Sequence, residues 1–499
     1  MKKHFQKSIP LIKELLIKAL IIGVGSYLIE HLWLDRQPWI VDMPLTGYSY
    51  EQKLLQDNFL DSKRQSPVVV FDISQSLPSL ASELQSEGKL TNGTEDQREN
   101  FKNAAMLLEQ ISNAKPTAIA LDWDISDPKD MPRASQTNLN PNSIRFDLWK
   151  SIRECTLKGI PVYFGADRFL KAGGHLSELQ EPYKHLACTL EQSSPKPGSF
   201  SDVSLVKGEG DIETLPVAIA EFKGLRGVRE SQPLELTKSR FFSMSPDEES
   251  SKREKFLINY EAVPAMIQES LDIYAKNGPI PAIADARIGK QFTGRVVILG
   301  DLLRPSPGDT ANYPISGASL NRFRSSFNAI VKGESADKEK AIDTSISLIS
   351  TSGVLYQASA IHTLLGNQVL VLTGPLSEFI FATMIGGFAS LLKMLFLSIL
   401  LTKRKFHSET AYAEIHRLFI ELFVAIVIIP FLVLWFCGQT HIHHLLVPGA
   451  PAILLSCLIE GFGEAAFALV VVRRHLHHQE QKNKSKVKPE SEPAAPAQP

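Results

Sequence analysis

The sequence predicts an α/β extracytoplasmic domain with a mostly parallel sheet, joined to an α-helical transmembrane bundle with one N-terminal and three C-terminal spans. Short β-branched runs alternate with amphipathic helical segments in the middle of the chain. This alternation is typical of a parallel sheet covered by helices. The most apolar segments of the 499-residue chain lie near its two ends. Each is about 20 residues or longer, the length that crosses a bilayer.

The predicted strands are short apolar runs, several of which end in an aspartate. A capping-box pattern, Thr94 with Gln97, begins the first predicted helix, and Gly159 ends the second. Three polar insertions (193–210, 243–253 and 303–344) receive no regular structure. The predicted strands are Pro67–Ser74, Thr117–Ser126, Ile160–Asp167, Phe256–Tyr260 and Arg295–Asp301; the predicted helices run from about Gln97 to Ala114, from Phe146 to Lys158 and from Val354 to Gly366.

Basic residues flank the predicted spans on one side, at both termini and between the second and third spans. Short segments rich in Lys and Arg stay in the cytoplasm, so the α/β domain is expected outside it. For the first span, a cleaved signal peptide is the alternative; for the other three, a buried helical hairpin. The expected division is 1–14 cytoplasmic N-terminus, 15–34 first span, 35–375 extracytoplasmic domain, 376–401 second span, 402–417 cytoplasmic loop, 418–438 third span, 439–446 outer loop, 447–472 fourth span and 473–499 disordered cytoplasmic tail.

The balance of charge and the cysteines narrow the function classes. The chain has 53 basic and 54 acidic side chains, a net charge of -1, so no nucleic-acid partner is predicted. The polar tail after residue 472 is too short for a kinase or cyclase domain. Cys155 and Cys188 would lie in an oxidising compartment, where either a disulfide or two buried thiols fits the sequence.

Aspartates follow three of the predicted strands: Asp72, Asp122 and Asp301. The carboxyl ends of neighbouring parallel strands meet at one edge of a sheet, where α/β proteins hold ligands. We therefore predict a site for a small polar ligand there, with Asp124 beside it and Asp309 as a further candidate. The alternative is that each aspartate caps a turn or helix. No catalytic residue, resident metal or cofactor is predicted, because no nucleophile, zinc or phosphate-loop motif accompanies the aspartates.

Three charged residues fall inside predicted spans: Lys393 in the second, and Glu460 and Glu464 in the fourth. Charges in hydrocarbon are costly and are usually paired. Lys393 and Glu464 lie at similar depth when counted from the outer ends of their spans. We therefore predict that they form an ion pair inside the bundle.

The order of these pieces resembles the CHASE2 family of extracytoplasmic sensor domains. The likeness lies in VVVFDIS, AAMLLEQI, AIALDWDIS, FTGRVVILGD and GVLYQASAIHTLLGN, followed by three spans. Where the family usually has a His-Ala pair, this chain has Gln357 and Ala358, with His362 about one turn later. Many family members continue into an output domain, and this sequence ends without one.

The resemblance implies a receptor in the cell inner membrane, with its large domain in the periplasm and membrane lipids around its spans. It would sense an unidentified extracytoplasmic small ligand or envelope state and signal to a separate membrane or cytoplasmic output partner. A homodimer is compatible with this function. Two alternatives come from the residues themselves. Intramembrane charges favour a transport or channel subunit, and metal binding by the strand-end aspartates would favour a membrane-anchored periplasmic hydrolase.

Overall fold

The computed structural model describes the chain in segments that form two compact units. One unit combines Met1–Gln37, Pro375–Gln439 and Gly449–Pro499; the other combines Pro38–Gly374 and Thr440–Pro448. The described residues are 2–29, 66–73, 95–136, 138–188, 212–223, 258–277, 286–302, 353–366, 371–372, 375–403, 419–420, 422–442, 445–446 and 450–486.

A five-stranded sheet forms the centre of the second unit, and all of its strand pairs are parallel. The spatial order is β1-β5-β2-β3-β4, so the last strand of the five in the chain lies between the first two. The prediction of an α/β fold with a parallel sheet is confirmed. The strands are β1 (Val68–Asp72), β2 (Ala118–Leu121), β3 (Val162–Gly165), β4 (Leu186–Ala187) and β5 (Val296–Gly300).

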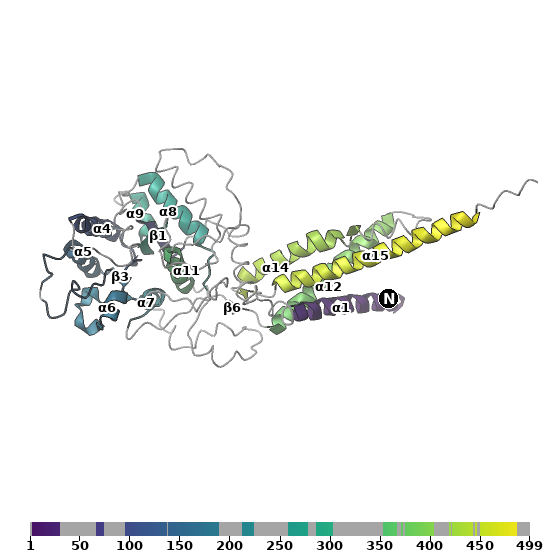
Figure 1. The fold of residues 1–499 in the computed structure, drawn as a ribbon, viewed down its shortest axis with the longest axis horizontal. Coiled ribbons are helices and arrows are strands. Elements are labelled where there is room, and N and C mark those ends of the chain that lie inside the picture. The colour runs from purple at the N-terminus through teal and green to yellow at the C-terminus, as the bar shows by residue number, and fades with distance from the viewer. Residues whose placement is uncertain are drawn as a thin grey trace, which may run out of the picture. The chain divides into compact units, whose positions relative to one another are not determined.

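Helices cover both faces of the sheet (Figure 1). Alternate residues of each strand point to opposite faces, so Val68 and Val70 pack on one side while Val69 and Phe71 pack on the other. The first side carries α7 (Leu215–Phe222), α8 (Val263–Asn277) and α11 (Gly353–Leu365), and the second carries α4 (Glu95–Asn113), α5 (Phe146–Leu157) and α6 (Asp167–Lys171). Short helices α9 (Ala286–Phe292), η3 (Leu176–Glu178) and η4 (Glu181–Tyr183) complete the described part of this unit.

Two details of the sheet differ from the prediction. The predicted strand Phe256–Tyr260 is wrong for Ile258–Tyr260, which are buried but irregular; Phe256 and Leu257 lie outside the described residues. The backbone N–H of Asn259 donates to Thr363 Oγ1 at 2.8 Å, so α11 takes the hydrogen bond that a neighbouring strand would have taken. Conversely, the two-residue β4 was not predicted, because two residues are too few to show a period.

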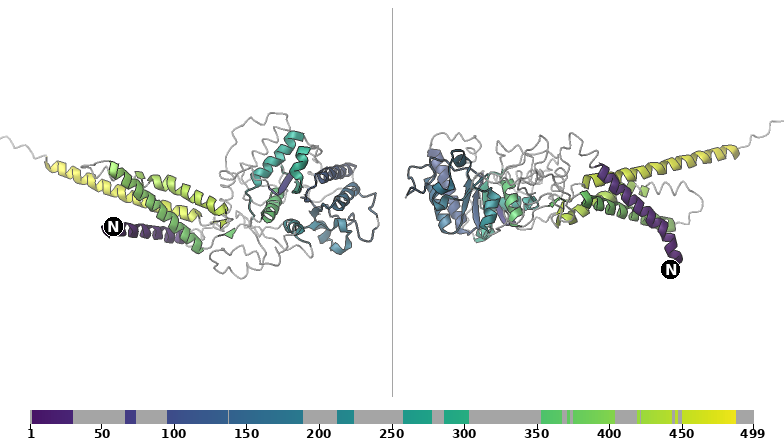
Figure 2. Two further views of the ribbon diagram at one scale, coloured as in Figure 1. Left: turned by 180° about the vertical axis from the view of Figure 1, so that it is seen from behind. Right: turned by 90° about the horizontal axis from the view of Figure 1, so that it is seen from below.

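The first unit consists of long apolar helices (Figure 2). Among the described residues, two helices are long and apolar enough to cross a membrane, at Glu378–Phe396 and Ala452–Val471. Two shorter apolar helical segments, Leu16–Leu28 and Val424–Gln439, correspond to the other two predicted spans. The helices are α1 (Lys2–Leu28), α12 (Pro375–Lys403), a π-helical turn at Val424–Ile428, α14 (Ile429–Ile442) and α15 (Ala450–Lys486).

The expected disordered tail, residues 473–499, is wrong for its first part because α15 continues to Lys486. Residues 473–486 contain no Gly or Pro, and half of them are Lys, Arg or Gln. These residues propagate a helix that the bundle has already nucleated. Residues 404–418 and 487–499 lie outside the described residues, as do Asp309 and the three polar insertions.

Helix α1 packs closely on α12 and α15. Ser456 Oγ donates to the carbonyl oxygen of Ile22 at 3.1 Å. A Cβ atom at Gly386 would lie only 2.9 Å from Cβ of Ile22, so glycine there lets the two helices approach. Specific contacts therefore join α1 to α12 and α15.

Candidate functional site

The sheet order places three of the predicted aspartates along one edge. Asp72 ends β1, Asp301 follows β5, and Asp122 follows β2. Because β5 lies between β1 and β2, Asp301 occupies the middle position. The register places Asp72 beside Gly300 and Leu121 beside Leu299, so the three strands end at nearly the same level. The predicted edge is therefore present, although Asp122 is not the direct neighbour of Asp72.

Asp72 is fully buried and has a structural contact. Its Oδ1 accepts a hydrogen bond from the backbone N–H of Leu302 at 2.8 Å, which fixes the turn after β5. Asp122 and Asp301 are half-buried. Oδ2 of Asp301 is itself buried, so these two side chains reach solvent only in part.

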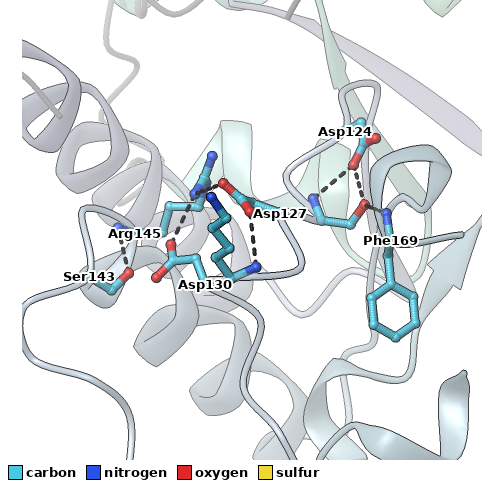
Figure 3. Close-up of polar contacts among 8 residues, drawn as sticks. Asp124, Asp127, Asp130, Ser143, Arg145 and Phe169 are labelled. Atoms are coloured by element: carbon cyan, nitrogen blue, oxygen red, sulfur yellow. Dashed lines mark hydrogen bonds and ion pairs between the residues drawn. The ribbon is translucent and has the colours of Figure 1, made fainter. Parts of the chain in front are cut away.

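Asp124 organises the loop after β2 and the start of α6 (Figure 3). Its Oδ1 accepts from the N–H and the hydroxyl of Ser126, and its Oδ2 accepts from the N–H of Arg168 at 2.8 Å. Ser126 Oγ in turn accepts from the N–H of Phe169 at 3.2 Å. Both carboxylate oxygens are thus used locally, so the geometry of Asp124 is that of a turn and helix cap.

A buried arginine lies in the same loop region and was not predicted from the sequence (Figure 3). Arg145 is 2% exposed, and its Nη1 lies 3.0 Å from Asp130 Oδ2 and 3.8 Å from Asp127 Oδ2. Its guanidinium also lies 5.0 Å from the centroid of the Phe101 ring. A buried charge must be paired, so Arg145 ties the loop after β2 to α4 and α5. The acidic residues in DISDPKD (124–130) were the sequence signal that could have predicted a basic partner here.

Helix α11 begins directly against the aspartate edge. A Cβ atom at Gly300 would lie 2.6 Å from Val354 Cγ2 and 3.1 Å from Asp122 Cβ, so only glycine leaves room for this approach. The first turn of α11 therefore packs against the end of β5. Within the described part of the chain, no group of three or more His, Cys, Asp or Glu is placed to hold a metal ion.

The two domain cysteines are not joined by a disulfide. Cys155 is buried between α5 and α4, with its Sγ 3.9 Å from the carbonyl oxygen of Leu108. Burial raises the pKa of this thiol to about 11. Cys188 Sγ lies 3.6 Å from the carbonyl oxygen of Ile212. The sequence left open either a disulfide or two thiols, and the structure has two thiols.

The charged residues of the helical unit come together. Lys393 is 3% exposed, and its Nζ lies 3.0 Å from Glu460 Oε2 and 3.3 Å from Glu464 Oε2. Lys18 of α1 also forms an ion pair with Glu464. The sequence analysis missed this partner, because it is 446 residues away along the chain. The four side chains form a neutral cluster that joins α1, α12 and α15.

A two-stranded parallel sheet joins the segment before α12 to the segment between α14 and α15. β6 (Val371–Leu372) pairs with β7 (Leu445–Leu446). β6 precedes α12 by two residues, and β7 lies between α14 and α15. Both strands belong to the same unit as the α/β domain. The segment that follows α11 is therefore hydrogen-bonded to the α14–α15 connection.

No protein-family model, curated protein or solved structure matches the chain. The interpretation of the site therefore depends on its geometry.

Proposed function

We propose that the chain is a multi-pass membrane receptor of the CHASE2 type. Its α/β domain senses a signal outside the cytoplasm and passes it through the helical bundle to a separate output partner. One observation carries the proposal: α11 packs on the aspartate edge of the sheet, and the chain runs from α11 through the β6–β7 pair into the bundle. In chain order α11 precedes β6 and β6 precedes α12, which supports α11 as the link between the domain and the bundle.

We propose four spans, with both termini in the cytoplasm and the α/β domain in the periplasm of a cell with two membranes. The basic segments around the spans support this topology. The β6–β7 pair supports it independently, because it joins the start of α12 to the connection between α14 and α15. That pairing requires both segments to lie on the same side of the membrane. Pairing of Lys18 with Glu464 supports α1 as a retained span.

For the ligand, Asp122 and Asp301 are the best-placed groups. Both are half-buried at the edge beside the first turn of α11. A polar small molecule with hydrogen-bond donors fits two carboxylates there. Asp72 and Asp124 hold the surrounding turns through the backbone N–H groups of Leu302 and Arg168. We therefore give them supporting roles, and we rank the receptor above a metal-dependent hydrolase.

Purification from native membranes in mild detergent tests the proposal. We expect a cytoplasmic kinase, cyclase or regulator to co-purify in stoichiometric amount. The control is a chain in which residues 404–417 are replaced by a Gly/Ser segment of equal length, because this expected cytoplasmic loop is where an output partner makes contact. The control should lose the partner and keep a folded α/β domain. A homo-oligomer with no partner would contradict the receptor function.

The charge cluster favours a second candidate, a transport or channel subunit. Lys393, Glu460 and Glu464 lie inside the bundle, where ionisable groups often mark ion or proton pathways. Flux through liposomes containing the purified chain separates the candidates. Flux that is lost in Lys393→Met supports transport, whereas a partner without flux supports the receptor.

A further inference from the structure

A buried histidine near the end of α11 lies between a hydroxyl and a carboxylate. His362 Nδ1 lies 3.0 Å from Ser66 Oγ, just before β1. His362 Nε2 lies 4.0 Å from Glu261 Oε1, just before α8. The His362 and Glu261 side chains are 6% and 9% exposed. One imidazole therefore connects α11 to the segments that begin β1 and α8.

The two nitrogens of the imidazole differ in their hydrogen bonding. Ser66 Oγ also accepts from the backbone N–H of Val68 at 3.1 Å, so the hydroxyl is fixed in place beside Nδ1. Nε2 has no hydrogen-bond partner among the described residues. At 4.0 Å the carboxylate is too distant for a hydrogen bond but near enough for an ion pair. Protonation would give Nε2 a charged partner that it lacks when neutral.

Much of the core on this side of the sheet is apolar. The strands packed on α11 contribute Val68, Val70, Val296 and Ile298 to this core, and α7 contributes apolar side chains including Val217 and Ile219. Among the described residues, Glu261 is the charged group within ion-pair distance of the ring. The C-terminal turn of a helix also favours a positive charge, and His362 lies in the last turn of α11.

We propose that His362 is a proton-binding site through which the α/β domain responds to external acidity. Histidine changes its charge between about pH 5 and pH 8. When His362 takes up a proton from water, both ring nitrogens become donors. Nδ1–H then donates to Ser66 Oγ, and Nε2–H pairs with the Glu261 carboxylate. Acid thereby strengthens the attachment of α11 to the segments before β1 and α8, and neutral pH weakens it.

This inference deepens the proposed receptor function, because it names protons as a signal that acts on the helix leading to the bundle. The Thr363 contacts with Asn259 lie beside this site and hold the same turn of α11. They do not titrate, so they keep α11 in place at all pH values. The His362 contacts add a pH-dependent contribution to the stability of α11 on the domain.

Amide hydrogen exchange of residues 353–366 in the purified full-length chain tests the inference. After correction for intrinsic exchange rates, acidification from about pH 7.5 to about pH 5.5 should slow exchange in wild type by about tenfold. That factor corresponds to a hydrogen bond to a charged group. In His362→Gln and in Glu261→Gln the difference between the two pH values should disappear. Glu261→Gln keeps the imidazole, so it also reports if His362→Gln does not fold.

The matched control is His185→Gln, at a second domain histidine that faces Tyr163 rather than α11. It should leave the pH response of residues 353–366 intact. Equal protection at both pH values in wild type, or a response that persists in Glu261→Gln, would overturn the inference. The measurement needs no output partner. A failure to find a partner would thus weaken the receptor proposal and leave the proton site standing.

Discussion

Replacing Lys393 with Met should destabilise the helical unit much more than replacing Lys18 with Met. Lys393 is 3% exposed and contacts two carboxylates, at 3.0 and 3.3 Å. Removing one partner of a buried ion pair costs about 3–5 kcal/mol, because Glu460 then loses the ammonium group that it contacts. Lys18 has a side chain that is 27% exposed, and Glu464 keeps Lys393 when Lys18 is lost. The expected cost for Lys18→Met is about 1 kcal/mol or less.

The assay is the free energy of unfolding in mixed detergent micelles with increasing denaturing detergent, followed by helical circular dichroism. The double variant Lys393→Met with Glu460→Gln removes the charge that the single variant leaves unpaired, so it should recover more than half of the loss. Glu464→Gln should also lower stability. Equal effects of Lys393→Met and Lys18→Met, or no recovery in the double variant, would refute the buried cluster.

Three further predictions concern the α/β domain. Gly300→Ala should destabilise it by about 1–3 kcal/mol through overpacking, and Val354→Ala should partly reverse this loss in denaturant unfolding because Val354 is the nearest side chain. Cys155 should resist alkylation at about pH 8 until the domain is unfolded, as measured by mass spectrometry, because burial raises its pKa to about 11 and keeps it a thiol. Burial also lowers the pKa of His185. The unfolded chain therefore binds the proton more readily than the folded one, and stability should fall as pH drops below about 6.5. His185→Gln should flatten this acid limb of a pH series of thermal unfolding curves.

The sequence predicted the strands that stand out locally as short apolar runs. β1, β2, β3 and β5 are short apolar runs, and their residues are almost completely buried. The position of β5 between β1 and β2 could not be predicted from the sequence, because strand order depends on contacts between distant segments. Ile258–Tyr260 shows the converse error. Its apolar residues are buried, but a helix rather than a strand satisfies its backbone.

The candidate site was predicted in the same partial way. Strand-end aspartates at one edge follow from the fold class alone. The different roles of these aspartates do not follow from the fold class, because they depend on which backbone N–H groups lie within reach of Asp72 and Asp124. The pair of Lys393 with Glu464 was predicted, because both residues are charges inside apolar segments. The pairs of Arg145 with Asp130 and of Lys18 with Glu464 were not, because nothing local in the sequence shows that these residues meet after folding.

The pairing of Lys18 with Glu464 has a consequence for the order of synthesis. At about 5–20 residues per second, a ribosome needs roughly 20 to 90 s to make the 446 residues that separate them. During that interval Lys18 lacks the Glu464 carboxylate with which it pairs in the folded chain. Lys393 likewise meets Glu460 and Glu464 only after α15 has been made. The charge cluster can therefore form only at a late stage of synthesis.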